Sequence, residues 1–225
     1  CSLPGRSGSG KVLYANHNDS DTFCGQIKAA FSAKAQAEGM DVEFLDAKGD
    51  GNLQIDQLNQ AIADHVSAIV LLAVDGTSIT PVVQKARDAG IPVVILNRDL
   101  SDKTVFGAMS DDREAGRMQG EFMAQNLPRD AQIVYLLGEE SQSSARNRWL
   151  GFKETCLDKR PDIKLLASVD GGWSKAEGLK AVTLWMQMFP RIDGVVAGND
   201  DMALGAIAAL KGANRLKGCL ISGVD

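Results

Sequence analysis

Short apolar runs alternate with longer stretches of helical periodicity along this chain. The runs are rich in β-branched residues, and several are apolar at every position. They lie at 12–15, 42–45, 69–72, 93–96, 105–109, 133–137, 164–166, 195–197 and 220–221. Strands that are buried on both faces of a parallel sheet need this continuous apolar character. The pattern therefore predicts a parallel β-strand at each run.

The stretches between the runs have the periodicity of amphipathic helices. A helix over 22–38 is expected to end before Gly39, and one over 78–89 before Gly90. Apolar residues also recur at helical spacing within 58–66, 115–123, 179–189 and 202–210. Strands that alternate with helices form βαβ units, so we predict an α/β fold with doubly wound parallel sheets.

One interruption of this alternation predicts a domain boundary. Two strand signals, at 93–96 and 105–109, follow each other with only the hydrophilic segment 97–103 between them. After this segment the alternation of strands and helices starts again. We predict a flexible leader over 1–10, an N-terminal Rossmann-like lobe over 11–103 and a C-terminal Rossmann-like lobe over 104–225.

Composition excludes several classes of protein. The 225 residues carry 24 basic and 29 acidic side chains, a formal charge of −5, without a basic stripe. Nucleic acid is therefore not an expected partner. A hydrophobic content of 44% is enough for a sizeable core, and no run of apolar residues has the length of a membrane span.

The cysteines and histidines do not have the spacing of a metal site. No two of the four cysteines form a C-x-x-C pair, and His17 and His65 are far apart, so neither metal nor cofactor is expected. The sequence does not decide whether any disulfide forms. Cys1 is followed by a Gly- and Ser-rich stretch. This start fits a lipid-anchored, processed chain, and it fits equally an arbitrary first residue.

Enzymatic motifs are incomplete. The segment Gly5 to Val12 nearly matches a phosphate-binding loop, but it has Val12 in place of Ser or Thr and precedes the first strand. No G-x-G-x-x-G follows the first strand, no G-x-S-x-G is present, and neither histidine lies in the second half. Catalysis is not expected.

Polar and aromatic residues gather where the predicted strands end. Ligands of doubly wound folds bind beyond the carboxyl ends of the strands. The candidate ligand-binding residues there are Asn16, Asp21, Phe23, Asn97, Arg98, Asp111, Arg146, Trp173, Asn199 and Asp225. Planar polar groups can bind the hydroxyls at the edge of a sugar, and aromatic rings can cover its faces. This set therefore suits a sugar or polyol better than a phosphate.

Several residues also have a purely structural interpretation. Asp19, Asp112 and Asp200 are candidate helix N-caps. Phe23 suits either the core or a ligand site. Trp149 and Trp185 lie within predicted helices, where packing is the expected role. Arg98 follows an apolar strand, where its charge needs a partner.

Four segments resemble the type I periplasmic sugar-binding proteins, above all the ribose- and inositol-binding group. They are 89–98, 110–116, 144–152 and 199–205, and the resemblance extends from Val12 to Asp225. It implies two lobes joined by a hinge, which close when a sugar binds in the cleft. Asn97 and Arg98 would bind hydroxyls from the first lobe, and Phe23 would line the pocket.

From the second lobe, the resemblance implies hydrogen bonds by Arg146, Asn199 and Asp225 and stacking by Trp173. Two features differ from the family pattern. Asn97 stands where many relatives have Asp, and the first loop has Ser20-Asp21-Thr22-Phe23 in place of Asn-Pro-Phe-Phe. Relatives also continue beyond Asp225, so we expect a truncated chain.

The same resemblance implies a monomeric periplasmic protein that delivers its sugar to the permease subunits of an ABC importer, or signals through a sensor receptor. Two alternatives stay open. The effector-binding core of a lactose-repressor-type regulator shares this fold, although no helix-turn-helix precedes the first strand. An α/β enzyme for a small polar substrate would need a complete catalytic set.

Overall fold

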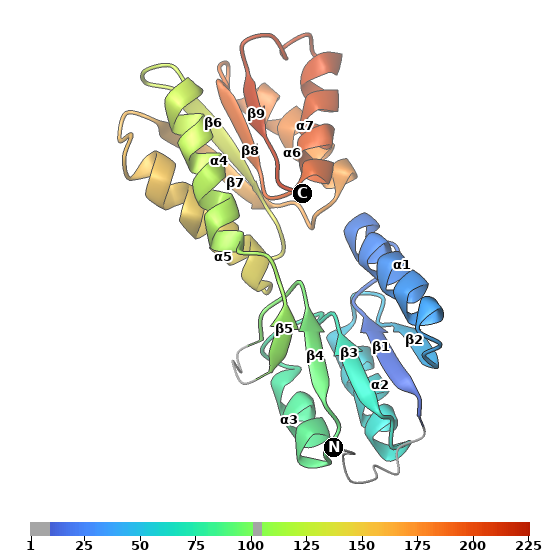
Figure 1. The fold of residues 1–225 in the computed structure, drawn as a ribbon. Helices are drawn as coiled ribbons and strands as arrows, with labels where there is room; N and C mark the ends of the chain where they lie inside the picture. Colours follow the sequence, from blue (N-terminus) through green and yellow to red (C-terminus); the bar gives the residue numbers. More distant parts are fainter. Residues whose placement is uncertain (1–9, 101–104) are drawn as a thin grey trace. The chain divides into compact units, whose positions relative to one another are not determined.

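The chain forms two compact units, the first ending at Ser110 and the second extending from Asp111 to Asp225 (Figure 1). A computed structural model describes residues 10–100 and 105–225. Each unit is an α/β structure with a parallel sheet, as predicted. The suggested lipid anchor at Cys1 and the leader before Gly10 lie outside the described residues. Among the residues that are described, no helix is long and apolar enough to cross a membrane.

The first unit contains a five-stranded parallel sheet with the order β2-β1-β3-β4-β5 (Figure 1). Its elements are β1 (Val12–Asn16), α1 (Thr22–Ala37), β2 (Val42–Asp46), α2 (Gly51–Ala63), β3 (Ala68–Leu71), α3 (Thr80–Asp88), β4 (Val93–Leu96) and β5 (Phe106–Ala108). The order places β1 and β3 in the interior, which explains why their side chains are apolar on both faces.

The two faces of this sheet have separate cores. Leu13 and Ala15 belong to a cluster that includes residues of α2 and α3. Tyr14 points to the other face, where its ring lies 5.0 Å from that of Phe31 on α1 and 5.3 Å from that of Phe44. Successive residues of a strand face opposite sides, so one run of apolar residues serves both layers.

The second unit contains a four-stranded parallel sheet with the order β7-β6-β8-β9 (Figure 1). Its elements are α4 (Asp112–Asn126), β6 (Gln132–Leu137), α5 (Ser143–Phe152), the π-helix η1 (Lys153–Leu157), β7 (Lys164–Asp170), α6 (Lys175–Met188), β8 (Gly194–Ala197), α7 (Asp200–Gly212) and β9 (Leu220–Ser222). Tyr135 and Phe152 belong to the core under α4 and α5, and Val134 and Leu136 to the core under α6 and α7.

Glycines let the helices of the second unit approach closely. A Cβ atom on Gly151 of α5 would collide with the backbone oxygen of Arg113 on α4. A Cβ atom on Gly205 of α7 would collide with the backbone oxygen of Lys175 on α6. Each helix pair therefore depends on a position without a side chain, and real Cβ atoms could not fit without moving the helices apart.

The predicted boundary after residue 103 is wrong. Strand β5 pairs with β4 in the first sheet, with Val94 opposite Phe106 and Leu96 opposite Ala108. The first unit therefore extends to Ser110. A missing helix between two strand signals indicated a change of lobe, but here the chain returns to the same sheet as an edge strand.

The predicted N-caps are also wrong, each by one or two positions. Asp21, Asp111 and Asn199 are the capping residues, and their side chains accept hydrogen bonds from the backbone N–H groups three positions ahead, at distances of 2.8–3.0 Å. Asp112 and Asp200 are instead the first residues of their helices. Asp19 precedes the cap of α1, and its carboxylate contacts Lys28 at 2.5 Å.

Candidate functional site

In the first unit, Asn16 ends β1 at the carboxyl edge of the sheet. Its side chain is fully buried, and its Nδ2 donates to Asp19 Oδ1 at 2.6 Å. Its Oδ1 atom is buried and accepts no hydrogen bond from any described residue. A buried acceptor without a donor is costly, so this oxygen is a natural position for a ligand hydroxyl.

Arg98 follows β4 at the same edge and is only 5% exposed. Its Nη1 atom donates to Ala73 O at 2.9 Å, which confirms the prediction that this charge needs a partner. The turn before it is tight, because Asn97 has a φ of 60° and Arg98 N donates to Leu96 O at 2.6 Å. Asparagine tolerates this left-handed conformation better than most residues, so Asn97 directs Arg98 back over the sheet.

Asp21 and Phe23 stand at the start of α1. The Oδ1 atom of Asp21 accepts from Cys24 N at 2.8 Å. Phe23 is 36% exposed and is therefore not a core residue. Its accessible ring fits the ligand-site interpretation better than the packing one. Five predicted site residues of the first unit therefore lie at or just after the ends of two strands. Asn16, Asp21 and Phe23 lie at the end of β1 and after it, and Asn97 and Arg98 follow β4.

In the second unit, Trp173 follows β7 and is held from several sides. Its Nε1 donates to Gln142 Oε1 at 2.8 Å, and its backbone oxygen accepts from Asn199 Nδ2 at 3.3 Å. The ring lies against Gly138, where a Cβ atom would collide with it. The guanidinium carbon of Arg148 lies 5.6 Å from the ring centre, within the range of a cation–π contact.

Arg148 and Asp112 form a buried ion pair that sequence reasoning missed. Arg148 Nε lies 2.9 Å from Asp112 Oδ1, and the two side chains are 9% and 7% exposed. Nη1 of Arg148 also donates to Gly198 O at 2.7 Å. The signal was present, because Ala145, Arg148 and Phe152 follow the helical spacing of one buried face.

The remaining predicted residues of the second unit have different surroundings. Arg146 is exposed and donates to Glu140 O at 2.6 Å. The Oδ1 atoms of Asp111 and Asn199 are engaged in capping. Asp225 lies in a cavity of about 400 Å³ within this unit. The cavity is lined by Ala115, Met118, Gln119, Phe122, Asp200, Ile221, Ser222, Gly223, Val224 and Asp225.

A family model described as a periplasmic binding protein domain matches residues 12–225. The chain belongs to the periplasmic binding protein family. The family consists of solute-binding proteins. Sugar- and polyol-binding relatives confirm the resemblance to the sugar-binding members of this family.

Three relatives of this binding protein illustrate the match. The chain is 35% identical to a xylitol-binding protein of Mycolicibacterium smegmatis, over 92% of this chain and 59% of the relative. It is 33% identical to a D-apiose import binding protein of Actinobacillus succinogenes, over 83% and 61%. The arabinose-transporter binding protein of Shewanella sp. ANA-3, solved with L-arabinofuranose, is 30% identical, with a TM-score of 0.88 over 96% and 74%.

The chain thus spans about three fifths of the length of the two curated relatives.

Sequence reasoning also missed His17, Cys24 and Gln142. His17 and Cys24 share one small cluster with Asp21, and Gln142 positions the indole of Trp173. Gln142 follows the sixth strand among other polar residues, so nothing in the sequence distinguished it.

Proposed function

We propose that this protein binds a five-carbon sugar or polyol and serves an ABC importer. The ligands named for the three relatives support this ligand class, because xylitol, D-apiose and L-arabinose all have five carbons. The ABC importer is supported by the arabinose-transporter relative. These names favour a transport role over the repressor-type alternative.

The observation that carries the proposal is the buried Arg98 guanidinium at the carboxyl edge of the first sheet. It has several N–H donors in a fixed plane, and the hydrogen bond from Nη1 to Ala73 O fixes the orientation of that plane. Adjacent hydroxyls of a sugar can each accept from such a group. The buried Oδ1 atom of Asn16 would accept from a further hydroxyl.

The second unit contributes a stacking surface and further polar groups in this proposal. Trp173 presents an indole whose orientation is set by Gln142 and Asn199. An aromatic face suits the C–H face of a sugar. Arg146 and Asp225 are exposed, and each makes a hydrogen bond with a nearby backbone group; we propose that they bind hydroxyls.

A thermal-shift screen tests the ligand class. Xylitol, D-ribose, L-arabinose and apiose are compared with hexoses and inositols. A ligand at about 100 times its Kd stabilises the folded state by about 2.7 kcal/mol. At about 2–4 °C per kcal/mol for a chain of this size, the expected shift is about 5–10 °C. Shifts confined to hexoses or inositols would refute the five-carbon assignment, and a flat screen would refute sugar binding.

Variants test the assigned residues. In Arg98→Met and Asn16→Leu, the ligand-induced shift is measured against each variant's own melting temperature without ligand, so a loss of stability alone does not count. We expect the shift to disappear in both. Lys85→Met is the matched control, because Lys85 is exposed and its Nζ donates to Asn59 Oδ1 at 2.6 Å. An undiminished shift in Arg98→Met would contradict the proposed role of Arg98.

Location and oligomeric state belong to the same proposal. We propose a periplasmic, extracytoplasmic location, because the family is that of periplasmic binding proteins, and a monomeric state in solution. Light scattering coupled to size-exclusion chromatography should give a mass near 24.0 kDa. A stable dimer would contradict the monomer.

A further inference from the structure

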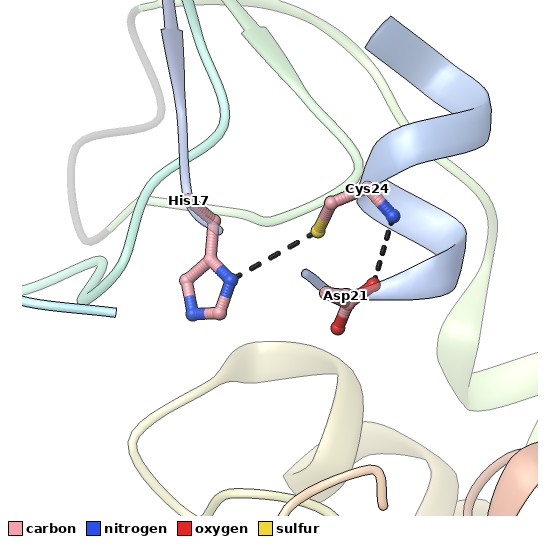
Figure 2. A group of neighbouring side chains, drawn as sticks. All are labelled: His17, Asp21 and Cys24. Carbon is pink, nitrogen blue, oxygen red and sulfur yellow. Dashed lines mark hydrogen bonds between the residues drawn. The ribbon is translucent and has the colours of Figure 1, made fainter. Parts of the chain in front are cut away.

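Three side chains of different chemistry converge where β1 leads into α1 (Figure 2). His17 directly follows β1, Asp21 caps α1, and Cys24 lies in the first turn of that helix. One ligand atom from each residue lies within 4.8 Å of the others. The short connection between strand and helix holds all three in the first unit, so their arrangement does not depend on any other part of the chain.

The imidazole of His17 is buried and poorly satisfied. Only 3% of His17 is exposed. Its Nδ1 atom faces Cys24 Sγ at a distance of 3.9 Å, which is a long contact (Figure 2). Its Nε2 atom forms no hydrogen bond with any described residue. Nδ1 is therefore the ring nitrogen that faces the cluster, and its only hydrogen-bonding contact with a described residue is this long one to sulfur.

Metal binding at this cluster needs an unprotonated imidazole and a thiolate. A bound cation would replace the thiol proton, which is released to solvent as the metal–sulfur bond forms.

The donor set favours zinc among the common divalent ions. One thiolate sulfur, one imidazole nitrogen and one carboxylate oxygen match Zn²⁺, whereas Ca²⁺ and Mg²⁺ prefer oxygen ligands only. Tetrahedral bond lengths to zinc place such ligand atoms roughly 3.4–3.6 Å apart. The 3.9 Å between Nδ1 and Sγ is close to this value, and the ligand atoms of all three residues lie within 4.8 Å of one another, so the three side chains would have to move closer together around the ion.

Nearby charges both favour and oppose a cation at this cluster. A thiolate and a carboxylate balance the charge of Zn²⁺, while Arg98 opposes a cation and Asp46 offsets Arg98. One oxygen of Asp21 accepts from Cys24 N at 2.8 Å, which fixes the orientation of the carboxylate. Its second oxygen is available for the ion, and such supporting hydrogen bonds are typical of metal sites.

We propose that His17, Asp21 and Cys24 form a Zn²⁺ site with three protein ligands and an open fourth position. The site requires no sugar and goes beyond the proposed transport function. The spacing His17-x₃-Asp21-x₂-Cys24 joins a strand end to a helix start, and it is not the C-x-x-C pattern by which zinc sites are usually sought.

Cobalt(II) alone, without sugar and without an affinity tag, is the probe for the site. A thiolate bound to Co²⁺ gives a charge-transfer absorption, and a tetrahedral site gives intense visible bands. We expect one equivalent of Co²⁺ to produce both, and Zn²⁺ to abolish both. Cys24→Ser should remove the charge-transfer band. Cys1→Ser and Cys219→Ser should keep it, which excludes binding at the N-terminus or at a surface thiol.

Asp21→Asn is the sharpest variant, because asparagine caps helices as well as aspartate but loses the carboxylate charge. Loss of a direct ligand should weaken Co²⁺ binding by more than the ~10–100-fold typical of supporting residues. His17→Gln should do the same, and His65→Gln should not. Zn²⁺ should also raise the melting temperature of the parent protein but not of Asp21→Asn. Absence of the bands, or their persistence in Cys24→Ser, would overturn the proposal.

Discussion

Replacing Arg148 with methionine tests whether the buried ion pair organises the second unit. Methionine keeps the unbranched aliphatic stem but removes the guanidinium. In the structure this group lies 2.9 Å from Asp112 Oδ1 and donates to Gly198 O at 2.7 Å. The substitution leaves the Asp112 carboxylate, only 7% exposed, without its guanidinium.

The expected cost is about 3–5 kcal/mol, the range found when one partner of a buried ion pair is removed. This cost already includes the lost hydrogen bond to Gly198 O, because the same guanidinium forms that hydrogen bond and the ion pair with Asp112. Arg146→Met is the matched control. Arg146 lies on the same helix but is exposed, so its loss should change the free energy of unfolding by less than about 0.5 kcal/mol.

Tryptophan fluorescence is a selective assay for this unit. All three tryptophans, Trp149, Trp173 and Trp185, lie in the second unit. Urea unfolding followed by their emission should show a midpoint lowered by roughly 2 M for Arg148→Met, if m is about 2 kcal/mol/M. Equal midpoints for the two arginine variants would refute the reasoning.

The double variant Arg148→Met/Asp112→Leu distinguishes the ion pair from simple packing. Replacing both partners of a buried pair with apolar groups is often neutral. We therefore expect the double variant to recover most of the stability that Arg148→Met loses. A double variant as unstable as the single one would show that the loss comes from packing around the side chain instead.

Three further predictions concern helix packing, capping and pH. Gly151→Ala should lower stability by about 1–3 kcal/mol, because its Cβ meets the neighbouring helix; a gain in urea midpoint, as helix propensity alone would give, would contradict this. Asn199→Ala should cost about 1 kcal/mol by removing the cap of α7, measured in the same way, and Asn199→Asp should restore the cap but not the hydrogen bond from Nδ2 to Trp173 O. Arg160 holds the pKa of Asp162 below its usual range. The pKa of Asp162 is thus lower in the folded state than in the unfolded state, where it has the ordinary value of about 4. The carboxylate therefore stabilises the protein at pH values above about 4, and this contribution is lost as the pH falls through the folded-state pKa. Asp162→Asn should therefore be less stable than the parent at neutral pH and match it in acid; an equal gap at both pH values would refute the assignment.

Much of the fold was predictable, because local chemistry decides it. A strand buried on both faces of a parallel sheet must be apolar throughout, as in β1 and β3. Helices must present an apolar stripe, and Gly39 and Gly90 both have the positive φ that follows a helix end. The strand-end position of Arg98 and Trp173 follows from the same pattern. The sequence by itself thus determined the elements and the parallel architecture.

The tertiary structure decided what depends on contacts between distant residues. Which sheet β5 joins is settled by pairing with β4, which a short apolar run does not encode. Helical spacing places Arg148 on the buried face of α5, but its partners Asp112 and Gly198 are distant in sequence and are set by the packing of elements. Sequence patterns report the environment of each residue along its own element, whereas pairing and charge compensation arise only when elements pack together.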